Sequence, residues 1–95
     1  MSTVAVKVPT ILRTYTGGES SVTVPVADGA TLGDVVAALD TAYPGIAGRV
    51  LDDAGTIRRF VNVYVNDDDV RFADGLGTPT PAGTRVSVIP AVAGG

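Results

Sequence analysis

Residues 31–45, TLGDVVAALDTAYPG, carry their apolar side chains at intervals of three and four positions, which is the spacing of an α-helix rather than of a strand. One helical stripe holds the apolar residues Leu32, Val35, Val36, Leu39 and Tyr43. Thr31 and Asp34 have the spacing of a capping box at the start, and Pro44-Gly45 supplies the stop signal at the end. This stretch therefore predicts one helix of about three turns.

On both sides of this helix the apolar period changes to two, which is typical of half-buried β-strands. Alternating runs predict strands over 3–8, 20–26, 60–65 and 84–90, and a short returning strand over 70–72. Gly17-Gly18 marks a turn between the first two runs, which are expected to form an antiparallel hairpin. Residues 66–69 are expected to form a turn, and residues 49–59 and 73–83 to form connecting loops.

The order β-β-α-β-β-β predicts an α+β domain with one helix packed on a mixed sheet of four to five strands. Five valine-rich strands and one helix in this order resemble a β-grasp (ubiquitin-like) domain. The valines of the later strands are expected to face the helix. Phe60 and Ile89 have the opposite parity, so they are expected on the uncovered face. Exposed large apolar side chains often mark partner-binding surfaces, although single ones are also ordinary, and both interpretations stay open.

Composition narrows the function classes. The chain has 95 residues and a net charge of −3, with no histidine or cysteine, which removes thiolate nucleophiles, imidazole bases and the usual zinc ligands. Lys7 is the one lysine, and the six arginines are scattered apart from Arg58-Arg59, so nucleic acid is not an expected partner. We expect a single domain without enzymatic activity of its own.

Two observations on the sequence bear on where the protein is located in the cell. No apolar run approaches the roughly 18 residues of a membrane span. The N-terminal MSTVAVKVPT lacks a basic region followed by a long apolar stretch, so a signal peptide is not expected. These features predict a cytoplasmic protein without membrane contact.

Two charged clusters are candidate binding sites. Asp67-Asp68-Asp69 could begin a calcium loop, but Arg71 and Phe72 follow, and Thr78 stands where the closing glutamate is due, so a solvated turn is the favoured interpretation. Arg58-Arg59 is expected in solvent at the start of a strand, with contact to an acidic partner as the alternative. No metal site is predicted.

The last five residues, AVAGG, follow a proline that cannot extend a strand ladder. We therefore predict a domain over residues 1–90 and a flexible tail over 91–95. Fully extended, the tail reaches roughly 17 Å. On composition alone a Gly-Gly end is compatible with ordinary fraying, so its function depends on further evidence.

That evidence is a resemblance that covers nearly the whole chain. The ending VIPAVAGG after PAGTRVSV, together with VPTILRTYTGG, FVNVYVNDDDVRF and GLGTP, resembles the ThiS/MoaD family of ubiquitin-like sulfur carriers, and within it the actinobacterial carriers of cysteine biosynthesis. A terminal Gly-Gly alone is weak evidence. One that lies five residues after the last strand of a β-grasp domain is much more specific.

The resemblance implies that the Gly95 carboxylate is adenylated with ATP by an E1-like enzyme and then converted to a thiocarboxylate. In the cysteine branch, the thiocarboxylate sulfur adds to an aminoacrylate formed from O-phosphoserine on a PLP-dependent cysteine synthase, and a JAMM-type zinc metallopeptidase releases cysteine. Gly95 would be the covalent carrier position and Gly94 its slim neighbour, with Ala93 and Val92 in the entry channel. ATP and PLP would be bound by these partners, and no cofactor by the chain itself.

Other functions remain open. Carriage of sulfur for molybdopterin, thiamine or a sulfur-containing natural product would use the same chemistry. A ubiquitin-like protein modifier would use the same Gly-Gly end, although Lys7 is the one lysine that could accept a chain. A non-covalent adaptor with an incidental tail is the third possibility.

Overall fold

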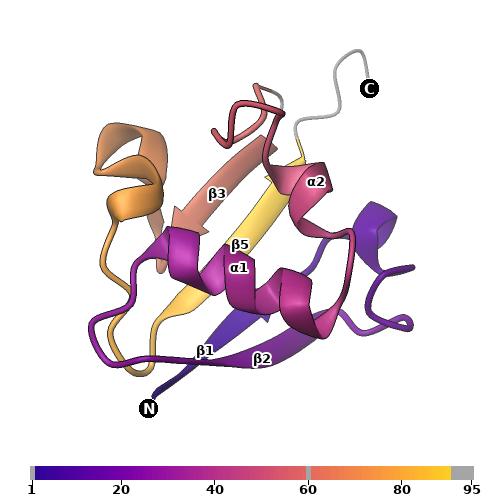
Figure 1. The fold of residues 1–95 in the computed structure, drawn as a ribbon, viewed down its shortest axis with the longest axis horizontal. Coiled ribbons are helices and arrows are strands. Elements are labelled where there is room, and N and C mark those ends of the chain that lie inside the picture. Colours follow the sequence, from indigo (N-terminus) through magenta and orange to yellow (C-terminus); the bar gives the residue numbers. More distant parts are fainter. Residues whose placement is uncertain (1, 60, 91–95) are drawn as a thin grey trace.

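The computed structural model describes residues 2–59 and 61–90, and Figure 1 shows a twisted sheet with a helix packed across one face. The strands are β1 (Ser2–Lys7), β2 (Ser21–Val26), β3 (Val61–Val65), β4 (Asp68–Asp69) and β5 (Arg85–Pro90). The helices are α1 (Leu32–Ala42) and α2 (Ala47–Val50), with 3₁₀ helices η1 (Thr10–Leu12), η2 (Val70–Phe72) and η3 (Gly75–Gly77). The predicted α+β fold of the β-grasp kind is confirmed.

The five strands form one sheet in the order β2-β1-β5-β3-β4. The predicted hairpin is present, because β1 and β2 are antiparallel. The last strand, β5, lies in the middle of the sheet, parallel to β1 and antiparallel to β3. This central position means that the chain leaves the sheet from its best-anchored strand.

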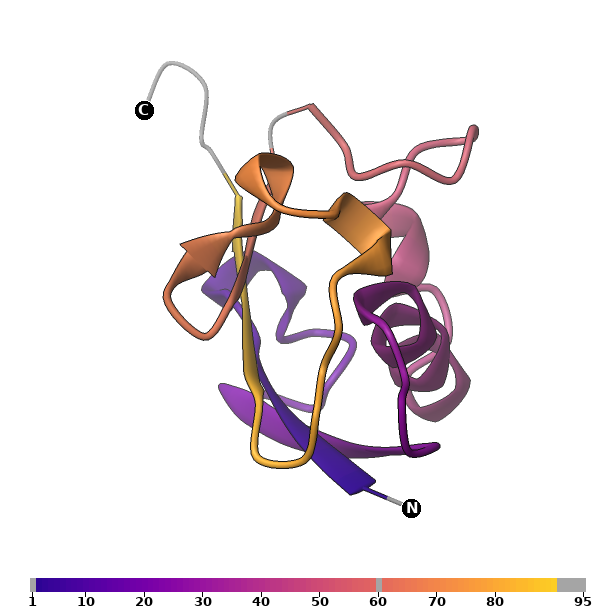
Figure 2. The same ribbon diagram turned by 90° about the vertical axis from the view of Figure 1, so that its left-hand side faces the viewer.

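The core lies between the sheet and α1, on the side where Figure 2 shows both α1 and α2. Alternate residues of each long strand are buried, and the valines predicted to face the helix are Val61, Val63, Val65, Val86 and Val88, all of them in the core. Leu32, Val35, Val36 and Leu39 of α1 pack against them, and Tyr43 is partly buried at the edge of the same cluster. The predicted stripe and strand parity are therefore confirmed.

Both ends of α1 use the residues that the sequence indicated. At the start, the backbone N–H of Thr31 donates to Asp34 Oδ2 at 2.9 Å, in a capping box. At the end, the chain turns through Gly45, whose φ is +97° and whose N–H donates to Asp40 Oδ1 at 3.0 Å. A side chain at Gly45 would be strained by this φ and would also lie 3.1 Å from the Tyr15 ring.

Gly45→Ala is therefore expected to lower the free energy of unfolding by about 1–2 kcal/mol, measured by urea denaturation. Gly48→Ala is the matched control, because a Cβ added to Gly48 in α2 would meet no atom within 4 Å. The control is expected to change stability by less than about 1 kcal/mol, in the stabilising direction. Equal effects of the two substitutions would contradict the assigned role of the Gly45 backbone.

The structure corrects the prediction for residues 66–72. The predicted strand over 70–72 is the 3₁₀ helix η2, and the residues that pair with β3 are Asp68 and Asp69, which the sequence pattern places in the turn. The turn itself is tighter than predicted and includes Asn66, whose φ is +57°. The physical reason is that Asp69 Oδ1 accepts a hydrogen bond from the Arg71 N–H at 2.9 Å, which bends the chain out of the strand.

The connection over 49–59 is also more ordered than a simple loop. It begins within α2, where Val50 is buried, and a bridge then pairs Leu51 with Ile57. In the part of the chain that the structure describes, no helix has the length and apolar character needed to cross a bilayer.

Candidate functional site at the end of the central strand

The candidate site lies at the end of β5, where the chain leaves the sheet. Pro90 pairs with Val61, the first residue of β3, whereas the pairing with β1 ends at Ser87, so the point of departure is held against β3. The predicted carrier and tail residues Gly95, Gly94, Ala93 and Val92 lie outside the described residues, as does Phe60. Their assigned roles stay predictions.

Ile89 lies next to this point and is 48% exposed on the sheet face opposite α1. It pairs with Asn62 on β3, while its neighbour Val88 faces the core. The predicted orientation of Ile89 is therefore confirmed, and its role in docking stays a prediction.

Two more exposed apolar residues lie in segments that flank this end of the sheet, and the sequence pattern did not indicate the exposure of either. Among the described residues, the large hydrophobic side chains classed as exposed are Ile11 (63%), Phe72 (91%) and Ile89. Ile11 follows Thr10, which lines a groove together with Ile89. Phe72 follows Arg71, which contacts the first residue of β3.

Both of these residues lie in 3₁₀ helices, η1 and η2, which the period-two and period-3.6 patterns do not reveal. One signal was available for Ile11. It lies two residues after Pro9, where the first strand has ended. The exposure of Phe72 is not expected from the sequence, because the pattern predicts a strand over residues 70–72.

Arg71 fixes the segment that leads into β3. Its Nη2 lies 2.8, 3.0 and 2.7 Å from the carbonyl oxygens of Arg58, Arg59 and Val61. Its Nη1 donates to Asn62 Oδ1 at 2.9 Å. One planar guanidinium thus binds four acceptors on a short stretch of chain, a geometry that an ammonium group cannot reproduce. Arg71 therefore holds the strand that borders the exit of the chain.

Arg71→Ala is expected to lower the free energy of unfolding by about 1–3 kcal/mol, because several carbonyl oxygens lose their donor. Arg71→Lys should recover only part of this loss, since the ammonium cannot span the acceptors. Urea denaturation measures both values. Full recovery by lysine would show that the charge, rather than the fork of donors, stabilises the segment.

The charged clusters of the sequence have structural roles. Among residues 2–59 and 61–90, no three Asp, Glu, His or Cys side chains lie together in a way that could hold a metal ion. Arg58 and Arg59 are both exposed, and Arg58 Nε donates to the Gly48 carbonyl oxygen at 2.9 Å, linking the connection to α2.

Asp52 stabilises the tight turn within this connection. Its Oδ2 accepts from the Thr56 hydroxyl at 2.8 Å, and its Oδ1 accepts from the backbone N–H groups of Thr56 and Ala54. The Thr56 hydroxyl is the largest cause that lowers the pKa of Asp52 below its ordinary value, followed by the Thr56 backbone N–H. The stabilisation is therefore fully present above the ordinary pKa and is lost only as the pH falls through the lowered one.

The fold and the last described strand define the class: a β-grasp domain whose final strand lies in the middle of the sheet and has the exposed Ile89 next to its end. The ThiS family model matches residues 6–95, and the chain belongs to this family.

Several relatives are similar along nearly the whole chain. The sulfur carrier protein CysO of Mycobacterium tuberculosis is 51% identical over 94 residues, which is 97% of this chain and 98% of the relative. Small archaeal modifier protein 3 of Haloferax volcanii is 44% identical over 78 residues, 82% of this chain and 84% of the relative. The Amycolatopsis orientalis BexX/CysO complex contains a chain with a TM-score of 0.87 and 44% identity, at 97% coverage of this chain and 99% of that one.

Proposed function

We propose that this protein carries sulfur on its C-terminal carboxylate. The observation that carries the proposal is the 51% identity to a sulfur carrier protein over almost the entire length of both chains. The match to the ThiS family extends to residue 95 and so includes the Gly-Gly end. The protein is a carrier in this proposal, and its partners perform the catalysis.

The proposed loading has two steps. In the first, an oxygen of the Gly95 carboxylate attacks the α-phosphorus of ATP on an E1-like enzyme, and pyrophosphate leaves. In the second, hydrosulfide supplied through the partner attacks the acyl carbon, AMP leaves with the former carboxylate oxygen, and loss of the thioacid proton gives the thiocarboxylate. Activation is needed because a carboxylate is a poor electrophile. The chain has no cysteine that could intercept the activated acyl group.

The expected use of this sulfur is cysteine biosynthesis from O-phosphoserine. A PLP-dependent cysteine synthase would supply the aminoacrylate acceptor, and a JAMM-type zinc metallopeptidase would release cysteine and restore the Gly-Gly end. The resemblance of the sequence to the actinobacterial carriers of cysteine biosynthesis is the reason for preferring this route to carriage for molybdopterin, thiamine or a sulfur-containing natural product.

Loading is tested by incubating the full chain with ATP, the E1-like enzyme of the same organism and a sulfide source. The intact mass is expected to increase by about 16 Da, because one sulfur replaces one oxygen on the carrier. Addition of the cysteine synthase and O-phosphoserine should then convert this species into a cysteine adduct. Failure of the first mass change with the cognate enzyme would reject carriage, and failure of the second alone would reject the cysteine route.

A second function is favoured by a specific observation, the 44% identity to a protein named as a modifier. A modifier would join Gly95 to lysine side chains of target proteins through isopeptide bonds. A tagged chain expressed in its own organism should then give a ladder of larger conjugates that resists denaturation and reducing agents. Conjugates of this kind without a thiocarboxylate species would favour the modifier over the carrier.

A further inference from the structure

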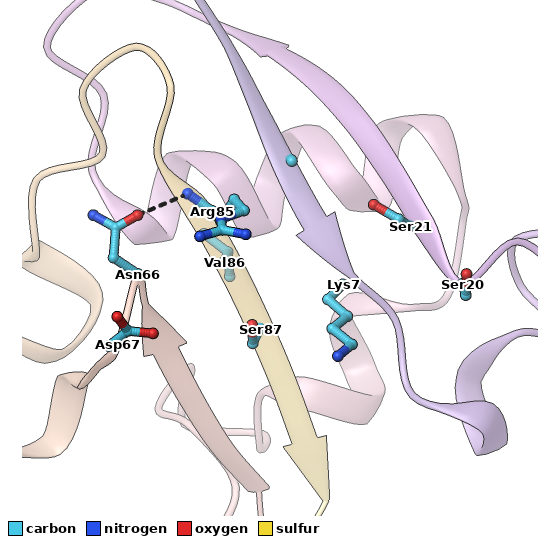
Figure 3. A pocket seen from close by; sticks show the side chains of 9 residues that line it. Lys7, Ser20, Ser21, Asn66, Asp67, Arg85, Val86 and Ser87 are labelled. Atoms are coloured by element: carbon cyan, nitrogen blue, oxygen red, sulfur yellow. Dashed lines mark hydrogen bonds between the residues drawn. The ribbon is translucent and has the colours of Figure 1, made fainter.

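The open face of the sheet, opposite α1, contains a polar hollow of about 320 Å³ between β1, β5 and the turn that follows β3 (Figure 3). Lys7 extends from β1 and Arg85 from β5, and both side chains are exposed. The hollow therefore contains the chain's one lysine and one of its six arginines, although the net charge of the protein is −3.

The register of the two parallel strands sets the spacing of these cations. Lys7 lies opposite Ser87, and Arg85 is two residues earlier than Ser87 on the same face of β5. Their Cα atoms are thus diagonal neighbours, about 8 Å apart from standard strand spacings. Within residues 2–59 and 61–90, no carboxylate lies within ion-pair distance of either cation.

The other groups lining the hollow are mostly hydrogen-bond donors. The hydroxyls of Ser20, Ser21 and Ser87 make no hydrogen bond to another described residue. Asn66 Oδ1 accepts from the Arg85 backbone N–H at 3.1 Å, which leaves its amide NH₂ as a donor, and Asp67 is the one carboxylate that lines the hollow. Two cations, three hydroxyls and an amide are complementary to an oxyanion, whereas a metal ion would need acceptors.

The hollow adjoins two depressions that Ile89 lines. Ser87 also lines the groove that contains Ile89, and it lines a second depression with Ile89 and Asp67. Along β5, Arg85 and Ile89 are four residues apart, about 13 Å. A partner surface of standard size that covers Ile89 is large enough to reach the hollow as well.

We propose that the hollow is an electrostatic docking site for an acidic side chain of the enzyme that activates the C-terminal carboxylate. The identity of this partner rests on the proposed function. One carboxylate fits better than a phosphate-rich partner, because Asp67 and the net charge of −3 oppose polyanions. The contact would accelerate association and fix the orientation of the carrier, so that the apolar contact at Ile89 forms beside the exit of the chain.

The test compares two double charge reversals that change the net charge equally. Lys7→Glu with Arg85→Glu alters the hollow. Arg49→Glu with Arg58→Glu alters the side covered by the helices, because Arg49 lies in α2 and Arg58 contacts it. Stopped-flow association of the full chain with the E1-like enzyme is measured at about 50 mM salt, where screening of charges is weak, and at about 500 mM salt, where it is strong. Circular dichroism confirms that both variants are folded.

The hollow variant is expected to associate about tenfold more slowly than the wild type at low salt, with the difference shrinking at high salt. The helix-side variant should remain within about twofold. Equal slowing of both variants would show a general charge effect and overturn the proposal. Binding of inorganic phosphate in the hollow by NMR, with association unaffected by the reversal, would also overturn it and assign a phosphate site instead.

Failure of this inference can be separated from failure of the proposed function. If the wild type gains the expected mass and the hollow variant is loaded with the same kcat/KM, sulfur carriage stands and the docking site is rejected. If the wild type neither binds the E1-like enzyme nor gains mass, both are rejected.

Discussion

A chain extended by one alanine after Gly95 is expected to lose at least about 100-fold in the rate of thiocarboxylate formation, because a small displacement of a reacting atom has an effect of this size. The extension moves the reactive carboxylate one residue further from the domain and places a methyl group on the terminal residue. Glycine lets the backbone approach enclosing walls closely and adopt dihedrals that other residues rarely reach. The rate of the mass change on incubation with ATP, the E1-like enzyme and sulfide measures this loss of thiocarboxylate formation.

The matched variant for this experiment is Gly95→Ala, which keeps the chain length and adds only the side chain. Urea denaturation of both variants checks that a loss of loading does not come from unfolding of the domain. Loss of loading in the extended chain alone would assign the effect to position rather than to side-chain size. Normal loading of the extended chain would refute a carrier mechanism based on the terminal carboxylate.

Ile89→Asp is expected to lower kcat/KM for loading by about 30–100-fold, since a central apolar contact in an interface contributes about 2 kcal/mol or more. Ile89 is exposed on the open face beside the exit of the chain, so the substitution removes an apolar contact and introduces a charge that the partner must desolvate. Stability should change by less than about 1 kcal/mol because the side chain is not in the core.

Ala37→Asp provides the control. Ala37 is an exposed residue of α1, which packs on the face of the sheet opposite to Ile89, and the substitution changes the charge by the same amount. A similar loss of kcat/KM for both variants would mean that added charge, rather than the contact at Ile89, reduces loading.

Much of the fold could be predicted because the alternation of valines indicates which side chains of each strand are buried. Residues 61, 63 and 65 are buried valines while 62 and 64 are only partly buried, and the change of period at Thr31 coincides with the start of α1. The exposure of Ile89 follows from the same parity. These features depend on local pattern and on the requirement that one face of each element be buried.

The segment around η2 could not be predicted in this way, because long-range hydrogen bonds determine its conformation. Val-Arg-Phe at 70–72 has the composition of a strand, yet Arg71 is held by carbonyl oxygens ten or more residues earlier in the chain. The polar hollow escaped prediction for a related reason. Lys7 and Arg85 are 78 positions apart, and only the parallel pairing of β1 with β5 brings them together.

The central position of the last strand also affects how the protein is made. Because β5 pairs with both β1 and β3, the sheet cannot close until residue 90 has left the ribosome. Folding is therefore completed after translation of the domain rather than during it. Prematurely terminated chains lack the strand that joins the two halves of the sheet, so they should be removed by proteolysis.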